Sequence, residues 1–193
     1  GLKKSGINVL AGLDNDKSCS VTYEKNNKAK FICADIANYD FKKLKKLYSK
    51  DALKVLVGCA PCQPFSSHTF KMRKKVKDDR WNLLDHFIHA IEVIKPDVVS
   101  MENVRGVTKT DVFENFVRQL KLMNYEVDYG VVYTPNYGVP QNRSRLILLA
   151  SKLGKIGIPE KTHNKTNYIT VGDVISRLPA IKAGQKHKKD FLH

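Results

Sequence analysis

The stretch LVGCAPCQPFS, at residues 56–66, holds two thiols that could do chemistry, Cys59 and Cys62. Their C-x-x-C spacing is compatible with a redox pair, with half of a zinc site, or with a single nucleophilic thiol. Pro61 and Pro64 flank Cys62 and stiffen its backbone. A thiolate is a strong nucleophile, and a basic environment raises the fraction of the thiol that is ionised.

The rest of the sequence weighs against zinc and against a redox pair. A structural zinc site needs four ligands, but there is no second C-x-x-C, and the H-x-x-H of His86 and His89 is tighter than the usual histidine spacing. A redox C-x-x-C should lead directly into a helix, whereas Cys62 precedes Gln-Pro-Phe-Ser-Ser and a basic loop. We therefore predict no bound metal, with Cys62 as the candidate nucleophile and Cys59 as a small buried residue at a strand end. For any single cysteine taken without the rest of the sequence, inert packing is the favoured interpretation.

The elements that must position these thiols follow from the pattern of apolar residues. Apolar runs predict strands at residues 7–13, 30–34, 54–58, 97–101, 125–133 and 145–150, the first four of them buried and parallel. Helical periodicity predicts helices at residues 16–27, 40–50, 81–94 and 110–123. Two of these have a clear apolar face, made of Leu84, Phe87, Ile88, Ile91 and Ile94 in one helix and of Phe113, Phe116, Val117 and Leu120 in the other. The alternation predicts an α/β fold, an open sheet with helices on both faces.

Four residues with reactive or polar side chains follow the first four predicted strands. They are Asp14, Asp35, Cys62 and Glu102. Ligands of open α/β sheets bind beyond the carboxyl ends of the strands, and neighbouring strands lie about 5 Å apart. We therefore expect these side chains to reach one small substrate.

The charge of the chain indicates a polyanionic partner. Its 193 residues include 34 Lys plus Arg against 19 Asp plus Glu, a formal net charge of +15, which is typical of nucleic-acid binding. The alternative is that Lys-rich segments such as FKKLKKLYSK are solvated helix faces. There is no apolar run of membrane-spanning length and no visible signal peptide, and the four cysteines are expected to be thiols in a reducing compartment. We expect no membrane partner and a cytoplasmic location.

Three motifs, in this order and spacing, resemble those of the cytosine-5 DNA methyltransferases: PCQPFS (61–66), MENVRGV (101–107) and PQNRSR (140–145). The resemblance extends over residues 1–193. It implies a Rossmann-like sheet that binds S-adenosylmethionine and releases S-adenosylhomocysteine. It also implies methylation of carbon 5 of a cytosine flipped out of double-stranded DNA, in a bacterial restriction–modification setting associated with the nucleoid.

The resemblance assigns catalytic roles to four residues. Cys62 attacks carbon 6 of the cytosine, and Glu102 donates to N3, for which it must carry or share a proton. Arg145 binds O2, and Arg143 supports the site. A structural salt bridge is the alternative for Glu102, and a solvated strand face is the alternative for the two arginines.

In the segment that carries the two arginines, polar residues with long side chains recur at every second position. Gln141, Arg143 and Arg145 would share one side of an extended strand, and Ile147 and Leu149 would continue that face into the core.

The resemblance also assigns the cofactor and the DNA contacts. Asp14 would bind the ribose hydroxyls, with Asn15, Asp35 and Ile36 around the adenine, and Pro61 and Leu83 would complete the wall. Asp16 could instead cap the next helix. The basic loop at residues 66–80 would close over the DNA, and the predicted DNA-binding residues are Ser66, Arg73, Lys75, Arg80 and Gln141.

In this comparison the chain resembles a catalytic core that is truncated at both ends. Residues 1–150 form the methyltransferase core without its first strand and Gly-rich turn, and residues 151–193 form a basic connector to an absent target-recognition domain. The sheet would then lack a central strand, so a complementing chain or a missing domain is an expected partner, and the fragment alone is expected to be inactive. The alternative is a non-catalytic DNA-binding or assembly fragment of a split or degenerate methyltransferase.

Overall fold

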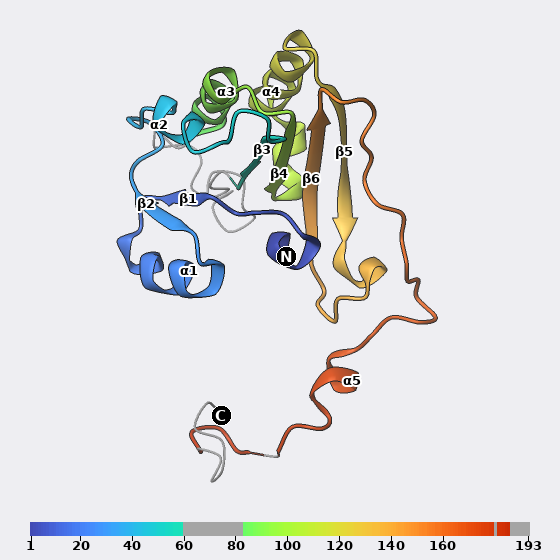
Figure 1. Ribbon diagram of the computed structural model, residues 1–193. Coiled ribbons are helices and arrows are strands. Elements are labelled where there is room, and N and C mark those ends of the chain that lie inside the picture. The colour runs from blue at the N-terminus through green and yellow to red at the C-terminus, as the bar shows by residue number, and fades with distance from the viewer. Residues whose placement is uncertain (60–82, 180, 186–193) are drawn as a thin grey trace, which may run out of the picture. The chain divides into compact units, whose positions relative to one another are not determined.

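The computed structural model describes residues 1–59, 83–179 and 181–185 of the chain. The chain divides into two compact units, Gly1–Val131 with Arg145–Ile158 and Val132–Ser144 with Pro159–His193. The predicted division into a core of residues 1–150 and a connector of residues 151–193 stays a prediction. The elements, labelled as in Figure 1, are the 3₁₀ helices η1 (Leu2–Ser5), η2 (Lys17–Cys19), η6 (Arg105–Lys109) and η7 (Thr134–Tyr137), the α-helices α1 (Ser20–Asn27), α2 (Lys42–Lys45), α3 (Leu83–Ile94), α4 (Asp111–Leu122) and α5 (Val171–Ile175), and the strands β1 (Ala11–Asp14), β2 (Lys30–Cys33), β3 (Val55–Gly58), β4 (Val98–Asn103), β5 (Glu126–Tyr133) and β6 (Ser144–Ser151).

The strands form two sheets. β1 pairs with β2 in parallel, and a separate four-stranded sheet has the order β3-β4-β6-β5. β3 and β4 are parallel, as predicted, whereas β6 runs antiparallel to β4. The α/β fold class is thus confirmed, with a mixed sheet that brings β4 between β3 and β6.

Helices α3 and α4 lie side by side and bury one face of the larger sheet (Figure 1). Every apolar position predicted for the two helices is buried: Leu84, Phe87, Ile88, Ile91 and Ile94 in α3, and Phe113, Phe116, Val117 and Leu120 in α4. Thr110 caps α4 by accepting from the Phe113 N–H, so the helix begins where the sequence predicts. Their side chains share the core cluster with residues of β4 and β6.

Two close approaches between helix and strand require glycine. A Cβ on Gly58, the last residue of β3, would stand 2.4 Å from the ring of Phe87 in α3. A Cβ on Gly12 in β1 would stand 2.4 Å from the ring of Tyr23 in α1. In both places an aromatic ring occupies the space of the absent side chain, which fixes how closely the strand approaches its helix.

Three sequence predictions about these elements were too broad or wrong. The strand predicted at residues 7–13 begins only at Ala11, and the helix predicted at residues 40–50 is helical only over Lys42–Lys45. The face of β6 that enters the core is not that of Ile147 and Leu149, which are half-buried. The fully buried residues are Leu146, Leu148 and Ala150, because α3 and α4 cover that side of the sheet.

In the second unit, the segment after Pro159 holds η7 and the turn that follows it. The Asn136 carbonyl accepts from the N–H groups of Thr162 and His163, both at 3.0 Å. The Asn136 side chain accepts from the Tyr168 hydroxyl at 2.6 Å. The turn that leads towards Gln141 is therefore anchored at Asn136.

Candidate active site

The carboxyl ends of β1 and β2 bring together the residues predicted to bind the cofactor. Asp14 is level with Cys33 in the parallel register, and its carbonyl accepts from the Ala34 N–H at 3.0 Å. Asp14 and Asn15 therefore lie beside the segment of Asp35 and Ile36. Both carboxylates are exposed, and Ile36 is half-buried against the core.

Local backbone hydrogen bonds hold both carboxylates. Asp14 Oδ1 accepts from the Asp16 N–H, and Asp35 Oδ1 accepts from the Ala37 N–H, each at 2.9 Å. Each turn engages one carboxylate oxygen, and the second oxygen of each group can accept from a hydroxyl or an amino group. This donor set fits the adenosine half of a nucleoside cofactor.

Asp16 has the capping role that was considered for it. Its Oδ1 accepts from the Ser18 N–H at 2.9 Å at the start of η2. Hydrogen bonds from the side chain and then the backbone of Ser18 lower the pKa of Asp16 below its ordinary value. The cap is therefore ionised at neutral pH and orders the turn that follows Asp14.

The second group of residues lies where β3, β4 and β6 meet. Glu102 is inside β4 rather than after it, and its Oε1 stands 3.0 Å from Nε of Arg145 at the start of β6. Its Oε2 accepts from the thiol of Cys59 at 3.1 Å. The Glu102 and Arg145 side chains are 34% and 24% exposed, so a substrate can reach the pair.

The prediction for Cys59 was wrong. The residue is exposed rather than buried, and it contacts a predicted catalytic carboxylate. Strand register explains the contact: Gly58 is level with Met101 in the parallel pair, so the next residues, Cys59 and Glu102, come side by side. Aligning the ends of the two predicted strands could have revealed this pairing.

Several predicted residues lie outside the described part of the chain, and their roles stay predictions. They are Cys62, Pro61, Ser66, Arg73, Lys75 and Arg80. Leu83 is described as the first residue of α3 and is half-buried.

Gln141 and Arg143 belong to the second unit, and both are exposed. Thr134 holds their backbone: its N–H donates to the Arg143 carbonyl at 2.9 Å, and its hydroxyl donates to the Gln141 carbonyl, with the Arg143 carbonyl oxygen 3.2 Å from the same hydroxyl. Sequence reasoning missed Thr134, because its role depends on a contact across the turn. The common face predicted for Gln141, Arg143 and Arg145 stays a prediction.

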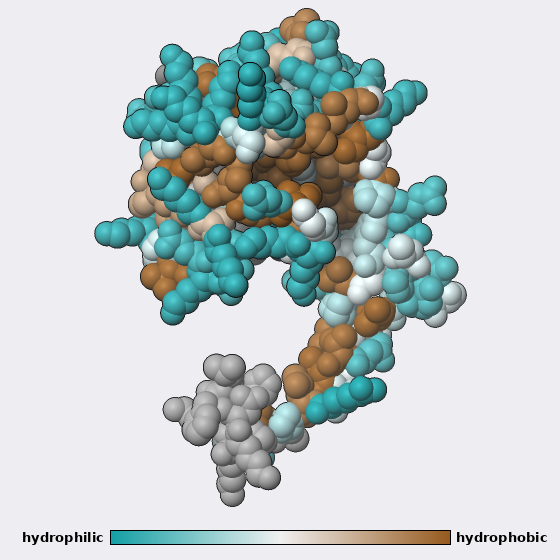
Figure 2. Space-filling view, viewed as in Figure 1, coloured by the Kyte–Doolittle hydropathy of each residue, from teal (hydrophilic) through white to brown (hydrophobic). Residues whose placement is uncertain are grey.

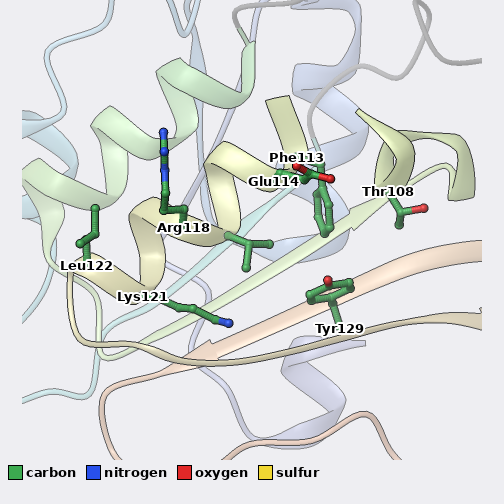
Figure 3. A pocket seen from close by; sticks show the side chains of 8 residues that line it. Thr108, Phe113, Glu114, Arg118, Lys121, Leu122 and Tyr129 are labelled. Carbon is green, nitrogen blue, oxygen red and sulfur yellow. The ribbon is translucent and has the colours of Figure 1, made fainter. Parts of the chain in front are cut away.

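A hollow of about 630 Å³ lies elsewhere in the first unit, between α4 and β5 (Figure 3). Phe113 and Tyr129 meet edge to face at its wall, with ring centroids 5.0 Å apart, and Arg118 and Lys121 lie at its side. It is on the helix-covered side of the sheet, away from Glu102. None of the residues predicted to act in catalysis or binding lines it.

Metal ligands and membrane-spanning helices bear on the class of protein. Within the described residues, no cluster of His, Cys, Asp or Glu is suited to a metal ion. The helices of the same residues are too short or too polar to cross a membrane.

Comparison with known proteins gives a consistent result. The family model for C-5 cytosine-specific DNA methylase matches residues 1–192. The Type II methylase M.HgiDII of Herpetosiphon aurantiacus is 45% identical, over 100% of this chain and 54% of that protein. The chain spans about half the length of the first curated relatives it matches, 54%, 50% and 43% of their residues.

Solved structures share the fold. A putative DNA modification methyltransferase encoded within an Escherichia coli prophage has a TM-score of 0.71 at 21% identity, covering 93% of this chain and 51% of the other. The Dnmt2 methyltransferase of S. pombe has a TM-score of 0.65 at 19% identity, covering 81% and 47% of the two chains. At these identities the likeness is evidence of fold alone.

Proposed function

Because the chain belongs to the C-5 cytosine-specific DNA methylase family, we propose that the complete protein methylates carbon 5 of cytosine in double-stranded DNA, with S-adenosylmethionine as the methyl donor. The observation that carries this proposal is the contact between Glu102 and Arg145, 3.0 Å apart at the level where β3 ends. Three residues beyond Cys59, the chain reaches Cys62, the proposed nucleophile.

The proposed reaction begins with Cys62. Its thiolate attacks carbon 6 of the cytosine, a carbon–sulfur bond forms, and electron density moves towards N3 and O2, which makes carbon 5 nucleophilic. When bound, S-adenosylmethionine supplies an electrophilic methyl group. Loss of the proton from carbon 5 and expulsion of the Cys62 thiolate then restore the aromatic ring.

Glu102 and Arg145 suit the charge that develops in this step. N3 and O2 are neighbouring acceptors on the cytosine ring, and one carboxyl group beside one guanidinium can address both. Both oxygens of Glu102 act as acceptors in the structure. Donation to N3 therefore requires that the carboxyl group carries or shares a proton when the base is bound, as the mechanism demands.

The cofactor roles rest on the ends of β1 and β2. We assign the ribose hydroxyls to Asp14, and the adenine to Asn15, Asp35 and Ile36, since these lie together and carry suitable acceptors. Pro61 and Leu83 complete the proposed wall. S-adenosylhomocysteine is the expected product.

DNA is the proposed partner, and the base must leave the duplex to reach Cys62. Ser66, Arg73, Lys75, Arg80 and Gln141 are the proposed DNA contacts, supported by the net charge of +15 and by the family. Relatives named as a Type II methylase and a Type II methyltransferase favour a restriction–modification role in a bacterial cytoplasm. Association with the nucleoid is part of the same proposal and follows from DNA as the partner.

A complementing strand is also proposed. In the described residues, β1 pairs with β2, and β3 pairs with β4, but no hydrogen bonds join the two sheets. β3 is an edge strand of the larger sheet, and its Val57 side chain is 50% exposed. A further strand, from the complete protein or from a second chain, would join the two sheets.

The second candidate function is a non-catalytic DNA-binding or assembly protein. The net charge of the chain and the two unjoined sheets favour it. However, DNA binding alone does not need the Cys59 thiol beside the Glu102 carboxylate and the Arg145 guanidinium. The two candidates therefore differ in whether Cys62 bonds to DNA.

The test is covalent trapping on duplex DNA that contains 5-fluorocytosine, with the complete protein and S-adenosylmethionine. Fluorine cannot leave carbon 5 as a proton does, so the adduct should persist through denaturing electrophoresis. We expect trapping by the wild type and by Cys19→Ser, and none by Cys62→Ser. Adduct formation by Cys62→Ser, or none by the wild type, would contradict the proposal.

A further inference from the structure

We propose that Cys59 is a positioning residue that holds the carboxyl group of Glu102 from the side opposite to Arg145. This inference rests on the proposed function, since it assigns Cys59 to the catalytic machinery without contact to the cytosine. It replaces the expectation that Cys59 only fills space at a strand end.

The order of the strands gives the geometry. β4 lies between β3 and β6, and Glu102 on β4 receives one donor from each side. The Cys59 thiol, directly after β3, donates to Oε2 at 3.1 Å, and Arg145 Nε on β6 donates to Oε1 at 3.0 Å. Because these two contacts engage different oxygens of Glu102, together they restrict the rotation of the carboxyl plane.

The backbone at Cys59 is itself well supported. Gly58 packs so closely on Phe87 that a Cβ would stand 2.4 Å from the ring. Phe87 in turn stacks on Phe116, with centroids 5.8 Å apart and an angle of 8° between the rings. The thiol is therefore presented from a strand end that the core holds in place, which is what a positioning residue needs.

The end of β4 is held as well. Asn103, the residue after Glu102, is 2% exposed, and its Oδ1 accepts from the Val104 N–H at 2.8 Å. Glu102 thus projects from a rigid backbone, and its remaining freedom lies in its side chain. That freedom is what Cys59 and Arg145 restrict.

The expected consequence is a change in rate rather than in binding. A thiol is a weak donor, and displacement of a reacting group by about 1 Å can cost on the order of 100-fold in rate. We expect Cys59→Ala to lower kcat roughly 10-fold with little change in KM for DNA. Cys59→Ser, whose hydroxyl can also donate, should keep most of the wild-type kcat.

The decisive experiment is a double-mutant cycle in the complete protein. If Cys59 acts through Glu102, Cys59→Ala should cost much less kcat when Glu102 is already replaced by glutamine. Cys19→Ala, at an exposed cysteine in η2, is the matched control. An equal loss in both backgrounds, a Cys59→Ser variant as slow as Cys59→Ala, or an unchanged kcat would overturn the proposal.

A second measurement separates this proposal from the methylation activity itself. In a Cys62→Ser background, Cys59 is the single cysteine of its tryptic peptide, so its alkylation by iodoacetamide can be followed by mass spectrometry. A neighbouring carboxylate disfavours the thiolate, so Glu102→Gln should raise the alkylation rate of Cys59 and leave that of Cys19 unchanged. If Cys59 reacts at the same rate with and without the Glu102→Gln substitution, the contact is refuted, whether or not the wild type methylates DNA.

Discussion

Arg145 meets Glu102 through Nε, at 3.0 Å, from a side chain that is 24% exposed. A lysine has no donor at that point of its side chain, and its ammonium cannot present the planar array of a guanidinium. We expect Arg145→Lys to lower kcat by roughly 10- to 100-fold. The substitution removes the Nε–H that faces Glu102, and with it the guanidinium proposed to bind O2 of the cytosine. Single-turnover methylation by the complete protein measures this, and a rate within a factor of two of the wild type would contradict it.

Tyr125 links the core to the pH dependence of folding. It is 4% exposed, and its hydroxyl donates to the Pro96 carbonyl just before β4. Burial, and then the charge of Asp97, raise the pKa of Tyr125 from 10.0 to about 12. The folded state therefore favours the protonated phenol, so this contribution to stability is complete below pH 10 and disappears between about pH 10 and 12.

We accordingly expect the free energy of unfolding to fall by up to about 2 kcal/mol through this window because of Tyr125. Urea unfolding followed by circular dichroism at pH 9 and at about pH 11.5 measures the fall. Tyr125→Phe should remove this part of it, and Tyr129→Phe, at an exposed tyrosine, should not. The same fall in all three proteins would argue against the assignment.

At the scale of elements, the contact between β3 and α3 can be tested through Gly58. Its Cβ would stand 2.4 Å from the Phe87 ring, so Gly58→Ala must displace the ring or the strand. We expect a loss of about 1–3 kcal/mol in the free energy of unfolding, as for other overpacked sites. Gly130→Ala in β5 is the matched control, because its Cβ would meet Ile158 at an ordinary 3.8 Å and should change stability little.

The sequence predicted helices α3 and α4 well and the strand faces less well. The two helices have apolar residues at every third or fourth position, and all nine of the predicted core residues are buried. In β6, alternation separates Ile147 and Leu149 from Leu146 and Leu148, but it cannot say which set faces the helices. That choice depends on the packing of α3 and α4, which lies outside the strand's own sequence.

The candidate site likewise has one part that the sequence predicts and one part that it does not. Asp14 and Asp35 come together because they end neighbouring parallel strands, which the order of elements predicts. Glu102 and Arg145 meet across an antiparallel pair, and the register that places Glu102 opposite Ile147 could not be read from the chain.

The helix predicted at residues 40–50 is shorter than expected. Its lysines, Lys42, Lys43, Lys45 and Lys46, bury little of the apolar surface that would stabilise a longer helix.

At the scale of the whole molecule, the charge of +15 predicts how the chain meets DNA. Each phosphate that the protein neutralises adds about −0.9 to the slope of log affinity against log salt. We expect weak binding to any duplex, with affinity falling at least tenfold between about 50 and 200 mM salt. A fluorescence titration on two unrelated duplexes measures this, and an affinity that hardly changes with salt would contradict a phosphate-binding surface.

The two separate sheets of the first unit bear on what this chain can do alone. Glu102, Arg145 and Cys59 belong to the larger sheet, whereas Asp14 and Asp35 belong to the pair β1 and β2. Figure 2 shows apolar surface in a hollow of the molecule. On the face of β6 opposite to the core cluster, Ile147 and Leu149 are only half-buried. Methyl transfer needs the two groups of residues in a fixed relation, since a displacement of even about 1 Å can cost on the order of 100-fold in rate. A strand that joined β1 to β3 would provide that relation.

We therefore expect the 193-residue chain by itself to bind S-adenosylmethionine poorly and not to methylate DNA. The described residues that we assign to the cofactor's adenosine half lie at the ends of β1 and β2, and no hydrogen bond in the described part of the chain joins these strands to the sheet of Glu102 and Arg145. Calorimetry and tritiated-methyl transfer should be run on this chain and on the complete protein side by side. Activity that appears only in the complete protein would support a joining strand. Turnover or micromolar cofactor binding by the chain alone would mean that β1–β2 and β3–β4 are already held in a productive relation without one.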